Sequence, residues 1–135
     1  MNLPFNALQK GVYDRVTADM PTTPIYCPFA PTDAALPFIA LSGMTATDVS
    51  AKAMTMFAVT CTFDVISASD RSFEELNGIL DSLQVALTRS DLTLADEWQE
   101  VQARVLSAGV ASEFNESGAS QHGTLQLRFD LVHVP

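Results

Sequence analysis

Hydrophobic residues between Thr55 and Leu87 recur first at every second position and then at every third or fourth. The first set lies on one side of an extended segment, as in a strand with one buried face: Phe57, Val59, Cys61, Phe63 and Val65. The second set has the spacing of one helical stripe: Phe73, Leu76, Leu80, Leu83 and Leu87. We therefore predict a long strand, to about Ile66, followed by an amphipathic helix that packs on it.

Start signals precede this helix at Ser69, Asp70 and Ser72, and Ser72 with Glu75 matches a capping box. Gly78 interrupts the helical pattern at a cost of up to about 1 kcal/mol. A close approach of the helix to the sheet is the interpretation we give to this glycine.

The remaining segments carry weaker patterns. Apolar spacing and Pro4 predict a helix over about 4–18, and the prolines of 21–37 allow only a short edge strand at 25–27. A brief strand is expected at 38–41, and a long polar hairpin loop at 42–53.

The C-terminal part begins with a connector at 88–96. Alternation predicts a strand at 101–105 and a terminal strand at about 124–131, with a polar loop at 112–121 between them. The expected fold is a single α+β domain over 1–135, with a mostly antiparallel sheet, two helices on one face, and the order α-β-β-β-α-β-β.

Composition agrees with a folded domain, because 47% of the 135 residues are hydrophobic. No apolar run is long enough to cross a membrane, and the N-terminal residues do not resemble a signal peptide. Cys27 and Cys61 are interpreted as buried thiols in a reducing compartment.

The formal charge of −9 argues against specific nucleic-acid binding, which needs a basic face. Acidity favours solubility, and a surface of like charge would also not retain DNA that passes close to it.

Candidate chemistry is sparse. His122 or His133 could pair with one of the two cysteines as base and nucleophile, but Cys61 lies on the apolar side of its strand, where a core residue is expected. Zinc-ligand spacing and phosphate-binding glycine motifs are absent from the sequence. Two acidic clusters are interpreted as solvated rims: Asp96, Glu97 and Glu100, and Glu113 with Glu116. We therefore predict no catalytic, cofactor or metal site.

An interface is the stronger expectation. The second side of the long strand carries Met54, Met56 and Ala58, and the chain ends in an alternating strand with Val132 and Val134. Exposed apolar stripes and open sheet edges are typical of assembling subunits, so we expect self-association, as in a closed ring.

Three segments resemble the tail terminator (tail completion, tail-to-head joining) proteins of long-tailed bacteriophages and gene transfer agents. They are the N-terminal "ALQKGVYDRV", the core "LPFIALSGMTATDVSAKAMTMFAVTCTFDVIS" followed by "RSFEELNGILDSLQVAL", and the closing "QHGTLQLRFDLVHV". The resemblance covers nearly the whole chain and concerns residue classes rather than invariant chemistry.

The resemblance implies a virion protein of the tail and neck, assembled in the bacterial cytoplasm. Such a protein forms a ring, usually a hexamer, that caps the tail tube, ends its polymerisation and meets the head connector or stopper protein. DNA would pass through the lumen without specific binding.

The polar loops 42–53 and 112–121 are our candidate docking elements. The interface residues expected there are Thr45, Thr47, Asp48, Ser50, Lys52, Met54, Met56, Glu113, Phe114, Asn115 and Glu116. Two alternatives stay open: a stand-alone cytosolic binding or adaptor module with a ferredoxin-like fold, and an enzyme with a site hidden in an α+β cleft.

Overall fold

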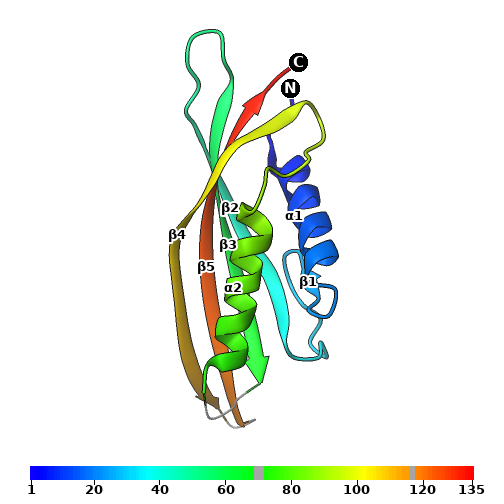
Figure 1. Ribbon diagram of the computed structural model, residues 1–135, viewed down its shortest axis with the longest axis vertical. Helices are drawn as coiled ribbons and strands as arrows, with labels where there is room; N and C mark the ends of the chain where they lie inside the picture. Colours follow the sequence, from blue (N-terminus) through cyan, green and yellow to red (C-terminus); the bar gives the residue numbers. More distant parts are fainter. Residues whose placement is uncertain (69–71, 116–117) are drawn as a thin grey trace.

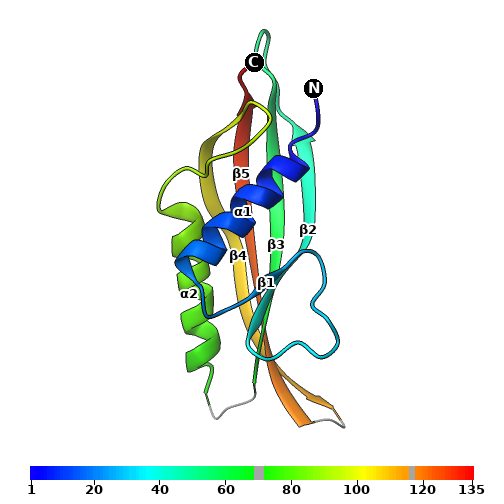
Figure 2. The same cartoon turned by 90° about the vertical axis from the view of Figure 1, so that its right-hand side faces the viewer.

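The computed structural model describes residues 1–68, 72–115 and 118–135. It is an α+β domain in which one five-stranded sheet carries two helices on a single face (Figures 1 and 2). The element order α-β-β-β-α-β-β is the predicted one. The elements are α1 (Phe5–Asp19), β1 (Ile25–Tyr26), β2 (Phe38–Asp48), β3 (Met56–Ala68), α2 (Glu74–Thr88), β4 (Trp98–Asn115) and β5 (Gly118–His133).

The strands lie in the order β1-β2-β3-β5-β4. Only β1 runs parallel to its neighbour, and it pairs with just Ile39 and Ala40 of β2. All other pairings are antiparallel, and β4 and β5 pair along nearly their whole lengths. The sheet therefore has β4 at one edge and, beyond the short β1, most of β2 at the other.

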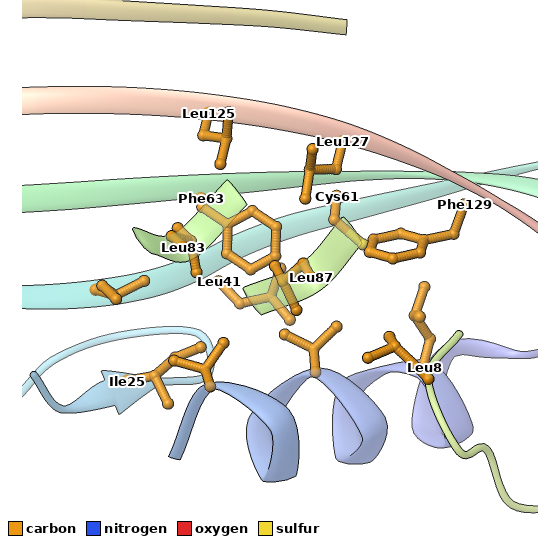
Figure 3. Close-up of a cluster of buried hydrophobic side chains, with 14 of the residues drawn as sticks. Leu8, Ile25, Leu41, Cys61, Phe63, Leu83, Leu87, Leu125, Leu127 and Phe129 are labelled. Carbon is orange, nitrogen blue, oxygen red and sulfur yellow. The ribbon is translucent and has the colours of Figure 1, made fainter. Parts of the chain in front are cut away.

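The alternation of β3 and β5 fixes the two faces of the sheet. Side chains of one parity are buried beneath the helices, including Val59, Cys61, Phe63, Leu127 and Phe129 (Figure 3). We call this side the covered face and the opposite side the open face. Leu8 of α1 and Leu83 and Leu87 of α2 point into the same core. The predicted packing of strand on helix is confirmed.

Three expected boundaries were wrong in the same direction, because strands continue where we predicted loops. β2 extends to Asp48, so only residues 49–55 connect it to β3. β4 begins at Trp98 and continues to Asn115, and β5 begins at Gly118. The two strands therefore include the described residues of the expected loop 112–121. Polar and small residues are tolerated in these strands because one or both of their faces contact solvent, which periodicity alone does not reveal.

The predicted capping box does not form. Ser72 lies two residues before α2, and its Oγ accepts a hydrogen bond from the backbone N–H of Glu74 at 3.3 Å. Glu75 instead accepts a 2.6 Å hydrogen bond from the hydroxyl of Ser67 at the end of β3. This bond joins the strand to the first turn of the helix. The other two start signals, Ser69 and Asp70, lie outside the described residues.

Arg15 of α1 joins the two helices. Its guanidinium donates hydrogen bonds to three carbonyl oxygens at the end of α2 and just beyond it, those of Ala86 (2.9 Å), Ser90 (3.3 Å) and Asp91 (2.9 Å). The carbonyl of Ala86 belongs to the last turn of α2, where a helix leaves carbonyls without an intrahelical partner. Arg89 adds a two-pronged ion pair with Asp19, at 2.8 and 3.2 Å.

The close approach of α2 to the sheet occurs at Gly123 of β5 and not at Gly78. A Cβ at position 123 would lie 3.0 Å from a methyl of Leu76 and 3.0 Å from one of Leu80, whereas one at position 78 would meet no atom within 4 Å. Our interpretation of Gly78 was wrong, because that glycine lies on the exposed side of the helix.

These two glycines give a matched pair of substitutions. Gly78→Ala should raise the free energy of unfolding by about 0.5–1 kcal/mol, since alanine is the better helix former and has free space. Gly123→Ala should lower it by about 1–2 kcal/mol, since Leu76 and Leu80 must shift. Urea unfolding of both variants measures the difference. Shifts of the same sign would contradict the assigned contact.

Candidate assembly surfaces

The described hairpin tip between β2 and β3 is held by its own hydrogen bonds. The backbone N–H of Ser50 donates to Asp48 at 2.8 Å, and the Ser50 hydroxyl bonds both backbone groups of Met56. Hydrogen bonds from Ser50 hold the pKa of the Asp48 carboxyl below its usual value. At the tip, Ala51 pairs with Met54 and Ala53 has a φ of 69°. The tip is therefore a built turn that presents exposed Lys52 and Met54.

The predicted docking residues do not gather at one site. The 49–55 tip lies at the same end of the molecule as both termini, and the β4–β5 hairpin lies at the opposite end (Figures 1 and 2). The 13 residues of β3 separate the two ends, which corresponds to about 40 Å. The two elements therefore present opposite ends of one subunit, and they can contact different partners.

The individual residues divide accordingly. Thr45 and Thr47 lie on the open face of β2, while Met56 is half-buried and pairs with Val132. Glu113 lies at the far end, where its carboxylate is 3.6 Å from Nδ1 of His122. The structure places Phe114 and Asn115 only by backbone pairing, and Glu116 lies outside the described residues.

The open face carries a ladder of polar pairs across the strands. His122 Nε2 lies 2.9 Å from Asp64, and Gln126 contacts Thr62 and Ser107. Asp130 is buried among donors: Gln102 donates to it at 2.6 Å and Arg128 at 2.9 Å.

Burial opposes ionisation of Asp130, but the two hydrogen bonds outweigh it and hold the pKa of this carboxyl below its usual value. Together these pairs make the open face polar. The expected apolar stripe does not continue along it, since Ala58 is buried and Met56 is half-buried, while the exposed Met54 and Val134 lie beyond the strands, in the loop and at the C-terminus.

The exposed apolar residues are found instead along β4. Sequence reasoning missed most of this strand, which is 18 residues long against a usual length of about 5–6. Register shifts at 100–102 and 105–107 mark two bulges. Four apolar side chains are 40–51% exposed: Val101, Val105, Leu106 and Val110. The adjacent pair Val105–Leu106 was a visible break in alternation, and it marks one of the bulges.

A second missed feature lies beside β2. Residues 28–36 and the open-face side chains of Phe38 and Ala40 line an apolar groove of about 600 Å³. Phe29 at its rim is 83% exposed. An exposed aromatic next to an apolar groove is typical of a protein interface.

Cys61 and the two histidines have different surroundings. Cys61 faces the core, where burial raises the pKa of its thiol to about 12, whereas His122 lies on the open face beside Asp64. His133 packs edge-on against Trp98. The described histidines therefore have other partners than Cys61. Within residues 1–68, 72–115 and 118–135, no three metal-ligating side chains gather, and no helix is long and apolar enough to cross a membrane.

One acidic cluster was misinterpreted. Glu100 is 9% exposed, because the alternation of β4 turns it toward the covered face, where it accepts a 3.3 Å hydrogen bond from the backbone N–H of Leu92. Burial raises the pKa of Glu100 to about 7. Asp96 and Glu97 of the same cluster are exposed, as expected, and both have positive φ.

The fold is similar to that of a chain in the solved structure described as the virion of a native gene transfer agent (GTA) particle. The two share 19% of their residues and superpose with a TM-score of 0.75, over 98% of this chain and 99% of that chain. At this level of identity the similarity establishes the common fold. No protein-family model matches the sequence, and no curated protein matches it.

Proposed function

We propose that the chain is a virion structural protein that forms a homo-oligomeric ring, most simply a hexamer, at the end of a tail tube. The ring would end tube polymerisation and join the tail to the connector or stopper protein of the head. The observation that carries this proposal is the fold similarity over the whole chain to a chain of a gene transfer agent virion.

Two features of the molecule support the proposal. The 49–55 tip and the β4–β5 hairpin, our candidate docking elements, lie at opposite ends of the subunit, as a joint between two different partners requires. The formal charge of −9 per chain multiplies in a ring and favours passage of DNA over binding. The protein would act through shape and assembly, without catalysis, cofactor or metal.

The test uses purified tail-tube subunits from the same genome. We expect the wild-type protein to form rings that bind one end of each tube and stop its elongation, as seen by negative-stain microscopy and length distributions. A protein that stays monomeric both alone and with tube subunits would contradict the proposal and favour the adaptor alternative. Turnover of a substrate would favour the enzyme.

A double substitution at the hairpin tip, Lys52→Ser with Met54→Ser, tests which end meets its partner. Both side chains are exposed, and the hydrogen bonds of Asp48 and Ser50 remain, so the ring should still form. Binding to the tube or to the connector should be lost. Glu113→Ser at the opposite end is the matched control, and it should affect the other partner. Loss of the same partner in both variants would contradict the two-ended arrangement.

A further inference from the structure

Within the described residues the sheet has two unpaired edges, which carry bulges but neither lysine nor proline. On one side β4 has no outer neighbour. On the other side β1 covers only positions 39 and 40 of β2, which leaves 41–48 free. Neither 101–112 nor 41–48 contains the lysine or proline that commonly blocks edge pairing. Bulges alone interrupt them.

The directions of the two edges are complementary. Counting through the sheet, β4 runs parallel to β3 and antiparallel to β2. When a second copy is placed beside the first in the same orientation, as rotational symmetry about a ring axis requires, its β4 meets β2 in antiparallel fashion. This contact is heterologous, so repeating it gives a ring when the rotation from copy to copy closes.

Charge also matches across these edges. In an acidic chain, residues 101–112 carry a single charge, Arg104, and residues 41–48 carry a single charge of opposite sign, Asp48. Arg104 lies level with Thr45 across the sheet, three positions from Asp48. The stagger that closes tilted strands into a ring can bring these two charges together.

Val105 and Val110 of β4 pair with Leu127 and Gly123, so they lie on the covered face of the sheet. A continuous sheet keeps its two faces, so these exposed valines would extend the covered face into the next subunit.

From these observations we infer that the occupant of the β4 edge is a second copy of this chain: β4 of one subunit pairs antiparallel with residues 41–48 of β2 in the next. The sheet would then continue from subunit to subunit around the ring. This inference rests on the proposed ring and specifies its contact.

Two variants each block one edge. Val105→Lys with Val110→Lys places lysines on the β4 edge, and Thr45→Lys with Thr47→Lys places lysines on the β2 edge. All four side chains are exposed, so both variants should fold. Val85→Lys is the matched control, because Val85 is a 54% exposed valine on α2, away from both edges. Circular dichroism and thermal melting confirm that each variant is folded.

We expect mass photometry or native mass spectrometry to show rings for the wild type and the control, and monomers for each edge variant. An equimolar mixture of the two edge variants should give a heterodimer and no larger species. Only one pair of intact edges remains in that mixture: β4 of the second variant and β2 of the first.

Several outcomes overturn the pairing. If the edge variants still form rings, the subunits contact each other elsewhere. The proposed function then still holds, provided that those rings cap tubes. A dimer formed by the β2-edge variant alone indicates β4-to-β4 contact. A wild type that stays monomeric at the highest soluble concentration also refutes it. Conversely, if the mixed variants form the heterodimer while wild-type rings fail to bind tubes, that result would refute the proposed tail function and support the strand pairing.

Discussion

Trp98→Ala should lower the free energy of unfolding by about 3–5 kcal/mol, the largest loss we expect from a single side chain. Trp98 is 2% exposed at the start of β4. Its indole ring packs edge-on against Phe57, with ring centroids 6.0 Å apart, and against His133 at 5.1 Å. Alanine would leave a cavity where three strands meet, because rigid neighbours from β3 and β5 cannot collapse into it.

Trp98→Phe is the matched control for this prediction. It keeps the aromatic packing and removes the buried indole N–H, for which the described part of the structure shows no acceptor. The loss of ring volume and the removal of an unsatisfied donor act in opposite directions, so the change should stay below about 1.5 kcal/mol. Urea unfolding followed by circular dichroism measures both variants. If both variants lose the same free energy of unfolding, the complete indole ring is required for stability, and filling the space with a smaller aromatic ring is not enough.

The second large effect concerns pH and depends on Glu100. Burial raises the pKa of this carboxyl in the folded protein from 4.5 to about 7. Between these values the folded state binds a proton that the unfolded state has released, so stability falls as the pH rises through about 7. We expect the wild type to lose about 2–3 kcal/mol between pH 4.5 and pH 8 through this group.

Glu100→Gln isolates that contribution. Glutamine keeps the size and can still accept the hydrogen bond from Leu92, but it does not ionise. The variant should therefore be more stable than the wild type at pH 8 and comparable to it at pH 4.5. Glu97→Gln is the control, because the Glu97 side chain is 60% exposed. If Glu100→Gln leaves the pH dependence of the free energy of unfolding unchanged, the Glu100 carboxyl must reach solvent as the protein fluctuates.

The assembly surfaces were predicted less well than the fold. The observed connection 49–55 overlaps only the end of the predicted loop 42–53, and the described part of the second candidate loop is strand. Period-2 patterns identify a strand when one of its faces is buried. β4 from 101 to 113 is largely exposed, its bulges break the alternation, and it therefore resembled a short strand and a polar loop.

The groove beside Phe29 could not have been predicted by periodicity. Prolines in 21–37 excluded regular structure there, but they did not show that the segment borders the open face of β2. Glu100 was missed for a similar reason. Its neighbours in sequence are polar, and only the pairing of β4 with β5 turns its side chain toward the connector.

What the sequence determined by itself is the order of the elements and the buried faces of β3, β5 and α2, because the alternation of the two strands and the helical stripe of α2 are local properties of the chain. The tertiary structure decided which strands form the edges, where α2 approaches the sheet, and which exposed residues lie together. Those features arise from contacts between segments far apart in sequence, such as Gly123 under α2 and β4 at the margin of the sheet. Local pattern carries no information about such contacts until the strands have been placed side by side.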